Sequence, residues 1–294
     1  MNAERRPLAL YPGCSLLSTG VMYRLSVHET LRALGIPVRE LADWNCCGAT
    51  SAHYLDAGLA LLLPARNLAL AEAQGVDILT ACAACHHHLA RAHHALAHSE
   101  SLGRSVEEHG IDYRGDVRVQ HVLTLLDDAG LAARVRRPLT GLRVACYYGC
   151  LLVRIPRAGG IDDPDAPSVM ERVLRACGAD VVAWQAGTWC CGAGLAVAEP
   201  DVAQGLMADI LAEAHRVGAD CIAAVCPLCQ LNLDLHQAAI ALHRGFRRML
   251  PVVFVTQLTA LALGADPRRL GFDRHLVDAL PVLAAVEVVA GGRR

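Results

Sequence analysis

The sequence has no uninterrupted apolar run long enough to cross a membrane. Its most hydrophobic stretches, 57–63 and 276–291, meet prolines or charged residues long before the roughly 18 continuous apolar residues that a spanning helix needs. The apolar residues near the N-terminus are interrupted by Pro12 and Gly13 before they reach the length of a signal-peptide core. We therefore expect a soluble, cytoplasmic protein that does not span a membrane.

Clusters of positive charge are also missing. The formal net charge is −2, and arginines never occur in runs longer than two, so the basic patch that nucleic acid requires is absent and we exclude nucleic acid as a partner. Neither a Gly-x-Gly-x-x-Gly fingerprint nor a ferredoxin-type Cys-x2-Cys-x2-Cys-x3-Cys-Pro run occurs. We expect the chain to lack its own nucleotide and electron-entry sites and to act within a complex.

Cysteine, in contrast, is abundant. The chain of 294 residues contains 13 cysteines, an odd number, and we expect no export signal. Because the cytosol keeps thiols reduced, a disulfide framework is a poor explanation, and cysteine-rich patterns there more often form metal sites or catalytic sites. We therefore expect metal binding.

Most of these cysteines belong to an internal duplication. Tyr-x-Gly-Cys occurs at 11–14 and 147–150, Cys-Cys-Gly-Ala at 46–49 and 190–193, and Cys-x-x-Cys at 82–85 and 226–229. Segments 117–126 and 252–261 correspond near the ends of the two copies. A gap of 34 residues separates the Cys-Cys pair from Cys-x-x-Cys in both copies, whereas the preceding gap is 31 residues in the first copy and 39 in the second. We interpret the extra length, at 159–167, as an inserted loop.

Each copy shows the same coarse pattern of secondary structure. Short apolar runs predict buried strands at 7–11, 78–82, 142–146 and 221–226. Apolar residues three and four apart predict helices at 21–34, 56–74, 86–98, 168–177 and 201–217. Alternating strands and helices are typical of α/β layers, whose strands deliver loops to a shared face. We predict an α/β fold of two pseudo-symmetric repeats, 1–136 and 143–294 with a C-terminal tail, joined by a linker at 137–142, with cysteine loops that converge on one site.

Five cysteines per copy exceed the needs of a zinc site. Zinc modules use four ligands and usually bring two Cys-x-x-Cys pairs within about 15 to 20 residues, but here those pairs are 140 residues apart. Four thiolates also suit an ordinary four-iron cluster. Adjacent Cα atoms lie about 3.8 Å apart and their side chains diverge, so a Cys-Cys pair reaches two neighbouring irons more readily than it chelates one. This favours an opened iron–sulfur cluster, with a structural zinc protein as an alternative.

Four glycines, Gly13, Gly48, Gly149 and Gly192, accompany the cysteines at matching positions. A glycine removes a side chain where the backbone approaches a cluster, and its N–H can donate to sulfur. An ordinary turn glycine explains these positions equally well. Tyr11 and Tyr147, three residues before the first cysteine of each copy, are expected to pack, and a hydroxyl directed at the cluster is the alternative.

Three cysteines stand outside the repeated set. Cys146, Cys177 and Cys221 align with Leu10, Leu34 and Ile78 of the first copy, so we interpret them as buried apolar residues. Cys146 precedes Cys150 by four residues and is the alternative ligand, but Tyr-x-Gly-Cys favours Cys150.

The histidine triplet 86–88 directly follows Cys85. The second copy has Gln230, Leu231 and Asn232 at the matching positions, so the triplet is not part of the repeated site. We interpret it as a helix-face cluster without function; if one histidine acts, we expect it to protonate a departing thiolate.

The cysteine pattern resembles that of a known family. Cys-x31-Cys-Cys-x34-Cys-x-x-Cys followed by Cys-x39-Cys-Cys-x34-Cys-x-x-Cys is similar to the paired cysteine-rich CCG domains of the catalytic B-type subunit of heterodisulfide reductase, over nearly the whole chain. The resemblance implies two non-cubane [4Fe-4S] clusters at a shared site, where a disulfide between two coenzymes is cleaved. It implies that the first cluster is held by Cys14, Cys46, Cys47, Cys82 and Cys85, and the second by Cys150, Cys190, Cys191, Cys226 and Cys229.

The expected function is therefore that of the catalytic iron–sulfur subunit of a heterodisulfide-reductase-like complex. Disulfide cleavage takes two electrons and a cluster normally passes one, so two clusters flanking the bond suit the reaction; thiol oxidation reverses it. The resemblance implies a ferredoxin-like iron–sulfur subunit and a flavin-containing subunit as partners. The alanine- and arginine-rich composition is compatible with a bacterium of high GC content, where relatives act in sulfur oxidation.

A non-catalytic electron-transfer subunit is the alternative, as in relatives that serve glycolate, lactate, glycerol-phosphate or succinate oxidoreductases. The intact second set of five thiols favours the catalytic function, because an electron relay needs no symmetric pair of clusters around a substrate.

Overall fold

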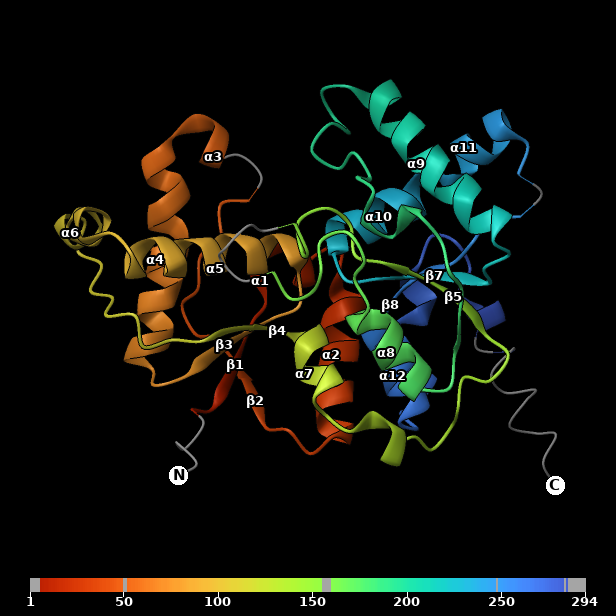
Figure 1. Cartoon of the computed structure of the whole chain (residues 1–294), viewed down its shortest axis with the longest axis horizontal. Helices are drawn as coiled ribbons and strands as arrows, with labels where there is room; N and C mark the ends of the chain where they lie inside the picture. Colours follow the sequence, from red (N-terminus) through yellow and green to blue (C-terminus); the bar gives the residue numbers. More distant parts are fainter. Residues whose placement is uncertain (1–5, 50–51, 155–159, 247, 283, 285–294) are drawn as a thin grey trace.

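The computed structural model of the chain describes residues 6–49, 52–154, 160–246, 248–282 and 284. Two sheets of similar design lie side by side, one in each half of the chain, as the red-to-yellow and green-to-blue elements of Figure 1 show. Within the described residues, no helix has the length and apolar character needed to cross a membrane.

The first sheet is parallel and has the order β2-β1-β3-β4. Its strands are β1 (Leu8–Tyr11), β2 (Val38–Glu40), β3 (Asp77–Thr80) and β4 (Val119–His121). The helices of this half are α1 (Gly13–Leu16), α2 (Val21–Ala33), α3 (Ala52–Leu55), α4 (Ala57–Ala73), α5 (Ala83–Ala97), α6 (Glu100–Glu108) and α7 (Val122–Asp127), followed by the 3-10 turn η1 (Leu131–Ala133).

The second sheet repeats the arrangement in the order β6-β5-β7-β8, again fully parallel. Its strands are β5 (Arg143–Tyr147), β6 (Asp180–Val181), β7 (Cys221–Ala224) and β8 (Val252–Phe254). The helices are α8 (Val169–Ala176), α9 (Pro200–Arg216), α10 (Pro227–Leu235), α11 (Gln237–Arg244) and α12 (Val255–Ala262), with 3-10 turns η2 (Ala186–Thr188), η3 (Pro267–Arg269) and η4 (Phe272–Arg274).

The central strands explain why the chain folds this way. All four residues of β3 and all four of β7 are buried, as expected for parallel strands covered by helices on both faces. The α/β fold, the two repeats, the four predicted strands and the five predicted helices are confirmed, with helix ends displaced by up to three residues. The described part of the predicted insertion, 160–167, forms turns without helix or strand; residue 159 lies outside the described residues.

The predicted alignment of the segments after the Cys-x-x-Cys motifs is wrong by two residues. Val119 is opposite Ile78 in the first sheet, and Val252 is opposite Ile222 in the second, so Val119, and not Val117, corresponds to Val252. A shift of two keeps every strand side chain on the same face, so the apolar pattern could not detect it.

The predicted counterpart of Cys221 is wrong by one residue. Cys221 pairs with Val144 as Asp77 pairs with Leu8, so Cys221 corresponds to Asp77 and not to Ile78. The segment from Gly218 to Cys226 is one residue longer than the segment from Gly75 to Cys82, which misled the alignment.

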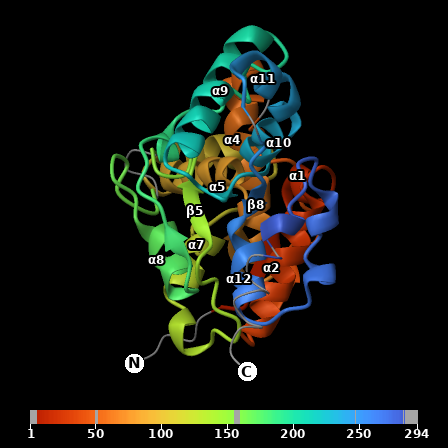
Figure 2. The same ribbon diagram turned by 90° about the vertical axis from the view of Figure 1, so that its right-hand side faces the viewer.

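The two repeats exchange helix contacts across their boundary. Helix α2 of the first half packs on α12 of the second, and α7 of the first packs on α8 of the second, as the central bundle of Figures 1 and 2 shows. Ser26 and Thr256 hydroxyls are 2.6 Å apart, and Tyr23 stacks on Phe254 with ring centroids 4.0 Å apart. The repeats therefore share one continuous core.

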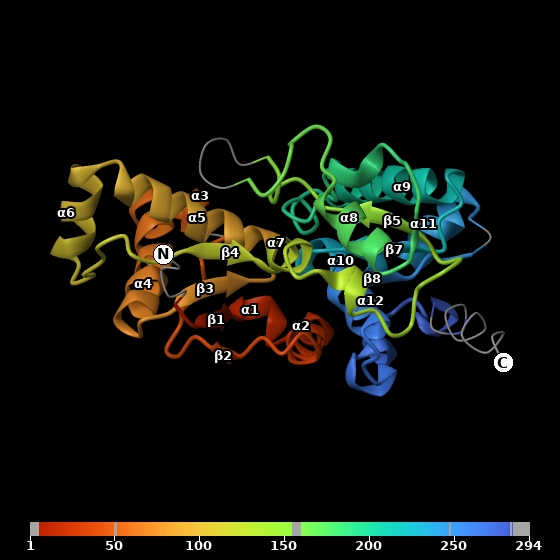
Figure 3. The same ribbon diagram turned by 60° about the horizontal axis from the view of Figure 1, so that its bottom comes forward.

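The connection between α7 and β5 is tied to the second half. The backbone N–H groups of Arg136 and Arg137 both donate to the carbonyl of Ala262, and Leu139 N–H donates to Cys177 O. We keep 137–142 as the proposed linker between the repeats. Figure 3 shows how this segment passes from the first half to the second beside α7 and α12.

Candidate metal centre

The strand ends deliver the cysteines to one region. Cys82 follows β3 and is the N-cap residue of α5, and Cys226 follows β7 and is the N-cap residue of α10. Cys14 lies in α1, just past β1, and Cys150 comes three residues after β5. Because β1 neighbours β3 and β5 neighbours β7, the carboxyl ends of each pair bring their thiols to the same edge.

The two Cys-Cys-Gly segments complete each set of thiols with the same geometry. The Sγ atoms of Cys47 and Cys85 are 3.5 Å apart, and those of Cys191 and Cys229 are also 3.5 Å apart. The N–H of Gly48 lies 3.4 Å from Cys46 Sγ, and that of Gly192 lies 3.4 Å from Cys190 Sγ. The predicted donation from these two glycines to sulfur is therefore present.

Further thiol interactions involve the remaining cysteines of both sets. Within the first set, Cys14 contacts Cys46, and Cys82 contacts Cys85. The second set contains the equivalent contacts, Cys150 with Cys190 and Cys226 with Cys229. The two sets meet at Cys82 and Cys226, whose thiols interact across the boundary between the repeats: Cys226 raises the pKa of Cys82, and Cys82 lowers that of Cys226. The structure thus brings together every cysteine predicted as a ligand.

Protons are shared unevenly within each set. Hydrogen bonding with Cys46 and Cys85 lowers the pKa of Cys47 to about 4, and hydrogen bonding with Cys150 lowers the pKa of Cys190 to about 6. The pKa of Cys150 is raised because it donates to Cys190 and is partly buried. Several close thiolates cannot form in a buried site without compensating positive charge, so full ionisation of these sets requires cations.

The donor set fits a cluster better than a single ion. A zinc site gathers four ligands about 2.0–2.3 Å from one point, but in the described part of the chain no three His, Cys, Asp or Glu side chains converge in that way. The thiols form an extended series instead, which suits several bridged irons. Cys14 and Cys190 are exposed to solvent, whereas Cys47, Cys82 and Cys85 are buried. Each set of thiols therefore has one cysteine that solvent can reach.

Gly13 and Gly149 leave room for sulfur. Both have positive φ, +60° and +69°, and a Cβ atom at either position would lie 3.0 Å from the Sγ of Cys85 or Cys229, respectively. Gly48 and Gly192 also have positive φ, but their missing Cβ atoms would meet Ala52 and Ala203. The first pair thus makes space at the thiols, and the second pair makes space for helix packing.

Two tyrosines brace the Cys-Cys-Gly segments. Tyr11 OH donates to Asn45 O at 2.6 Å, and Tyr147 OH donates to Trp189 O at 2.7 Å; each acceptor residue immediately precedes a Cys-Cys pair. Both tyrosines are about 1% exposed. The hydroxyls therefore hold the cysteine loops, a role that we did not predict, although the repeated Tyr-x-Gly-Cys motif carried the signal.

The first repeat holds its loop with one more side chain. Asn67, fully buried in α4, accepts from Asn45 N–H at 2.9 Å and donates to Asn45 O at 2.9 Å. No pattern in the sequence indicated this contact. In the second repeat, Asn232 donates to Cys191 O at 3.1 Å from α10 instead.

The three remaining cysteines are buried away from the contact series. Cys146, Cys177 and Cys221 have no exposed surface, which confirms their prediction as buried residues. Burial raises the pKa of Cys177 to about 12. Cys146 lies within β5, and its carbonyl accepts from Trp184 Nε1 at 2.9 Å; among the described contacts its thiol meets none of the ten.

The histidines after Cys85 differ in environment. His86 is buried; its Nδ1 lies 3.1 Å from Thr80 Oγ1 and its ring packs edge-on to His121. At the position of His121 the second repeat has Phe254, by the strand register above. The pair is therefore a feature of the first repeat alone, in agreement with the interpretation that it lies outside the repeated site.

Comparisons with known proteins agree with this geometry. The model of the CCG cysteine-rich domain matches residues 8–90 and 144–234. The chain is 31% identical to the 8-methylmenaquinol:fumarate reductase membrane anchor subunit of Wolinella succinogenes, over 94% of this chain and 98% of that protein. It is 30% identical to the B-type subunit of the ferredoxin/F420H2-dependent CoB-CoM heterodisulfide reductase of Methanosarcina acetivorans, over 98% of this chain and 99% of that protein.

A solved structure shares the fold. The crystal structure of a hypothetical protein from Helicobacter pylori matches 95% of this chain with a TM-score of 0.76 at 16% identity, and the match covers 55% of that longer chain. The family model, its two matched segments and the relatives that match over nearly full length lead to one conclusion: the chain belongs to the family of proteins with a duplicated CCG cysteine-rich domain, which includes the B-type subunits of heterodisulfide reductases.

Proposed function

We propose that this chain is the catalytic iron–sulfur subunit of a heterodisulfide-reductase-like complex. In this proposal Cys14, Cys46, Cys47, Cys82 and Cys85 hold one non-cubane [4Fe-4S] cluster, and Cys150, Cys190, Cys191, Cys226 and Cys229 hold a second. The reaction is the reductive cleavage of a disulfide or, in reverse, the oxidation of two thiols.

The observation that carries this proposal is the meeting of the two thiol sets. The thiols of Cys82 and Cys226 interact and shift each other's pKa although 144 positions separate them, because the two parallel sheets direct their strand ends to one region. Two separate metal sites on independent domains would not need such contact. A pair of sites that act on one bond does need it.

The electron count suits two equivalent sites. Cleavage of one S–S bond consumes two electrons and two protons and releases two thiols. Each cluster, when bound, would supply one electron and a metal ion that accepts a thiolate. The chain's own residues fix the geometry: Tyr11 and Tyr147 hold the two Cys-Cys loops through their backbone carbonyls, while the glycine N–H groups stabilise negative charge on Cys46 and Cys190.

The proposed partners follow from the relatives. Several relatives are named as subunits of reductases, among them the B-type subunits of three heterodisulfide reductases. We therefore infer that a ferredoxin-like iron–sulfur subunit and a flavin-containing subunit deliver or remove the electrons, in the cytoplasm, and that bacterial sulfur oxidation is one setting for the reaction. The exposed Cys14 and Cys190 lie where a substrate or partner can approach.

A second candidate function rests on a different relative. The similarity to the fumarate reductase anchor subunit, at 31% identity over nearly full length, favours a subunit that passes electrons to another enzyme. In that case the thiols would hold clusters for electron transfer and would bind no disulfide.

Iron, acid-labile sulfide and zinc per chain, measured on anaerobically purified protein, test the proposal first. We expect about eight iron and about eight sulfide, as for two four-iron clusters, with disulfide reductase turnover by the assembled complex. About four iron, or stoichiometric zinc, would contradict the two-cluster mechanism. Eight iron without turnover on any disulfide would favour the electron-transfer subunit.

A further inference from the structure

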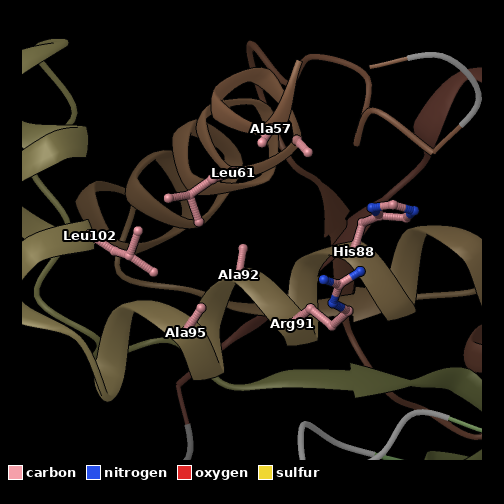
Figure 4. Close-up of a pocket in the computed structure, with 8 residues that line it drawn as sticks. Ala57, Leu61, His88, Arg91, Ala92, Ala95 and Leu102 are labelled. Atoms are coloured by element: carbon pink, nitrogen blue, oxygen red, sulfur yellow. The ribbon is translucent and has the colours of Figure 1, made fainter. Parts of the chain in front are cut away.

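A pocket of about 440 Å³ opens on the first repeat between α4, α5 and α6, and its described lining includes none of the ten cysteines. Its volume lies within the range of small-molecule sites. It is lined by Ala57, Ala60, Leu61, His88, Arg91, Ala92, Ala95 and Leu102. Figure 4 labels all of these except Ala60 and shows the labelled side chains around the space between the helices.

The pocket has a polar end and an apolar end. Figure 4 places Arg91 and His88 next to each other on α5, whereas Leu61 and Leu102 lie at the other end, with Ala92 and Ala95 between. Among the described residues, Arg91 is the only one lining the pocket with a permanent charge, and it forms no ion pair. Asp56 directly precedes the lining residue Ala57. Its carboxylate accepts a hydrogen bond of 2.8 Å from the N–H of Leu59.

The corresponding helices of the second repeat, α9, α10 and α11, differ from those that build this pocket. Helix α5 has 15 residues, but its counterpart α10 has nine and is followed at once by α11. Counted from the last cysteine of each repeat, Asn232 replaces His88 and Leu235 replaces Arg91. Asn232 is used for a backbone contact to Cys191. The cation at Arg91, and the extension of α5 beyond it, are features of the first repeat that α10 does not have.

We propose that this pocket binds a medium-chain carboxylate, with the carboxylate on Arg91 and the apolar chain along the alanines and leucines. A planar guanidinium matches a carboxylate in a bidentate pair, and the His88 imidazole contributes a polar surface beside it. The small side chains of Ala60, Ala92 and Ala95 leave the volume that an alkyl chain fills. The site uses none of the ten cysteines, so it does not depend on the proposed reaction.

Calorimetric titration of the anaerobically purified, cluster-containing full chain tests the site. The probe is octanoate, compared with octanol and octyltrimethylammonium at equal chain length. We expect one octanoate per chain and affinity for octanoate at least about tenfold above that for octyltrimethylammonium, because the charge-assisted pair to Arg91 favours an anion.

Three variants locate the binding. Arg91→Gln should weaken octanoate binding about tenfold or more, and Ala60→Leu should weaken it by occupying the apolar part, with iron content and apparent Tm of both variants unchanged. Arg104→Gln is the matched control: Arg104 is an exposed arginine of α6 near Glu100 and outside the pocket lining, so binding should be retained. Absence of saturable binding, or equal affinity in the Arg91 variant, would overturn the proposal.

Discussion

The two repeats differ least where the cysteines lie and most at their periphery. Both have the same strand order, the same 3.5 Å contact between a Cys-Cys pair and Cys-x-x-Cys, and the same tyrosine brace. Around this common core, the first repeat has a long α5 with a pocket, and the second has the insertion before α8 and a C-terminal segment fixed by Asp234, which accepts from the N–H groups of Leu276 and Val277.

This contrast separates the parts of the fold that serve the thiols from those that are free to change. Loop length before the Cys-Cys pair and helix length after Cys-x-x-Cys have diverged, but the contacts that set sulfur positions have not. Matched substitutions in the two repeats can therefore test whether equivalent geometry means equivalent chemistry.

The largest expected effect is loss of a cluster. Cys47→Ala and Cys191→Ala each remove a thiol that contacts the last cysteine of its own repeat, so each variant should lose about half of the bound iron and all disulfide turnover. Cys177 is buried and lies outside both sets of cysteines, so the Cys177→Ala variant should keep all of the iron. Iron and sulfide analysis checks this; a loss in only one of the two variants would show that the repeats are not equivalent.

Glycine substitutions next to sulfur should have the next largest effect. Gly13→Ala and Gly149→Ala place a methyl group 3.0 Å from Cys85 Sγ or Cys229 Sγ, at φ values of +60° and +69°, so both should reduce the iron content of their own repeat. Gly75→Ala is the control, because its φ is +65° but no atom lies within 4 Å of the new Cβ. It should cost only the conformational strain, roughly 1 kcal/mol. Equal iron in all three proteins would argue against close approach of sulfur.

Removal of the tyrosine hydroxyls should distinguish the repeats. In Tyr11→Phe, Asn45 O keeps its hydrogen bond from Asn67 Nδ2, whereas in Tyr147→Phe no other described side chain donates to Trp189 O. We therefore expect Tyr147→Phe to lose about 1–2 kcal/mol of stability and Tyr11→Phe to lose less. Apparent Tm and the rate of iron release to a chelator measure the difference; the opposite ranking would contradict the role assigned to Asn67.

The smallest effect concerns an ion pair at the edge of the first sheet. The hydrogen bond from Arg24 Nε, at 2.5 Å, lowers the pKa of Glu40, so Glu40 contributes stability above its unfolded pKa of about 4.3, and this contribution is lost as the pH falls through the lower folded pKa. Because both side chains are about one-third exposed, Glu40→Gln should cost only about 0.5–1 kcal/mol at pH 7.

The pH dependence and a matched position in the second repeat provide the control. The difference in apparent Tm between wild type and Glu40→Gln should shrink as the pH falls and should vanish below the lowered folded pKa of Glu40. By the strand register, Ala183 of the second repeat occupies the position of Glu40, and Ala183→Gln should show no such pH-dependent difference. A constant difference across the pH range would exclude the ion pair as its cause.

Periodicity and local spacing were sufficient to predict the elements and the cysteine sets. The apolar runs before Cys82 and Cys226 predicted β3 and β7, and the constant gap of 34 residues revealed the duplication. Since parallel strands bring their carboxyl ends together, the convergence of the thiols followed from the order of these elements.

Long-range contacts were beyond the reach of pattern analysis. The bond from Tyr147 to Trp189 joins residues 42 positions apart, and its signal was only a repeated tyrosine with several explanations. The two-residue error in the alignment of β4 with β8 arose because strand periodicity is blind to even shifts. The pocket at Arg91 depends on the relative positions of three helices, which no local pattern specifies.

The exchange of helices between the repeats bears on the origin of the chain. Helices α2 and α8 occupy matching positions in the two repeats, and so do α7 and α12. The contact of α2 with α12 is therefore equivalent to the contact of α8 with α7. An isologous interface between two identical subunits has this arrangement. A single ancestral repeat could bury these faces only by associating with a second copy of itself. Fusion of its gene to a duplicate would then have preserved a dimer within one polypeptide and freed each half to diverge at its own surface.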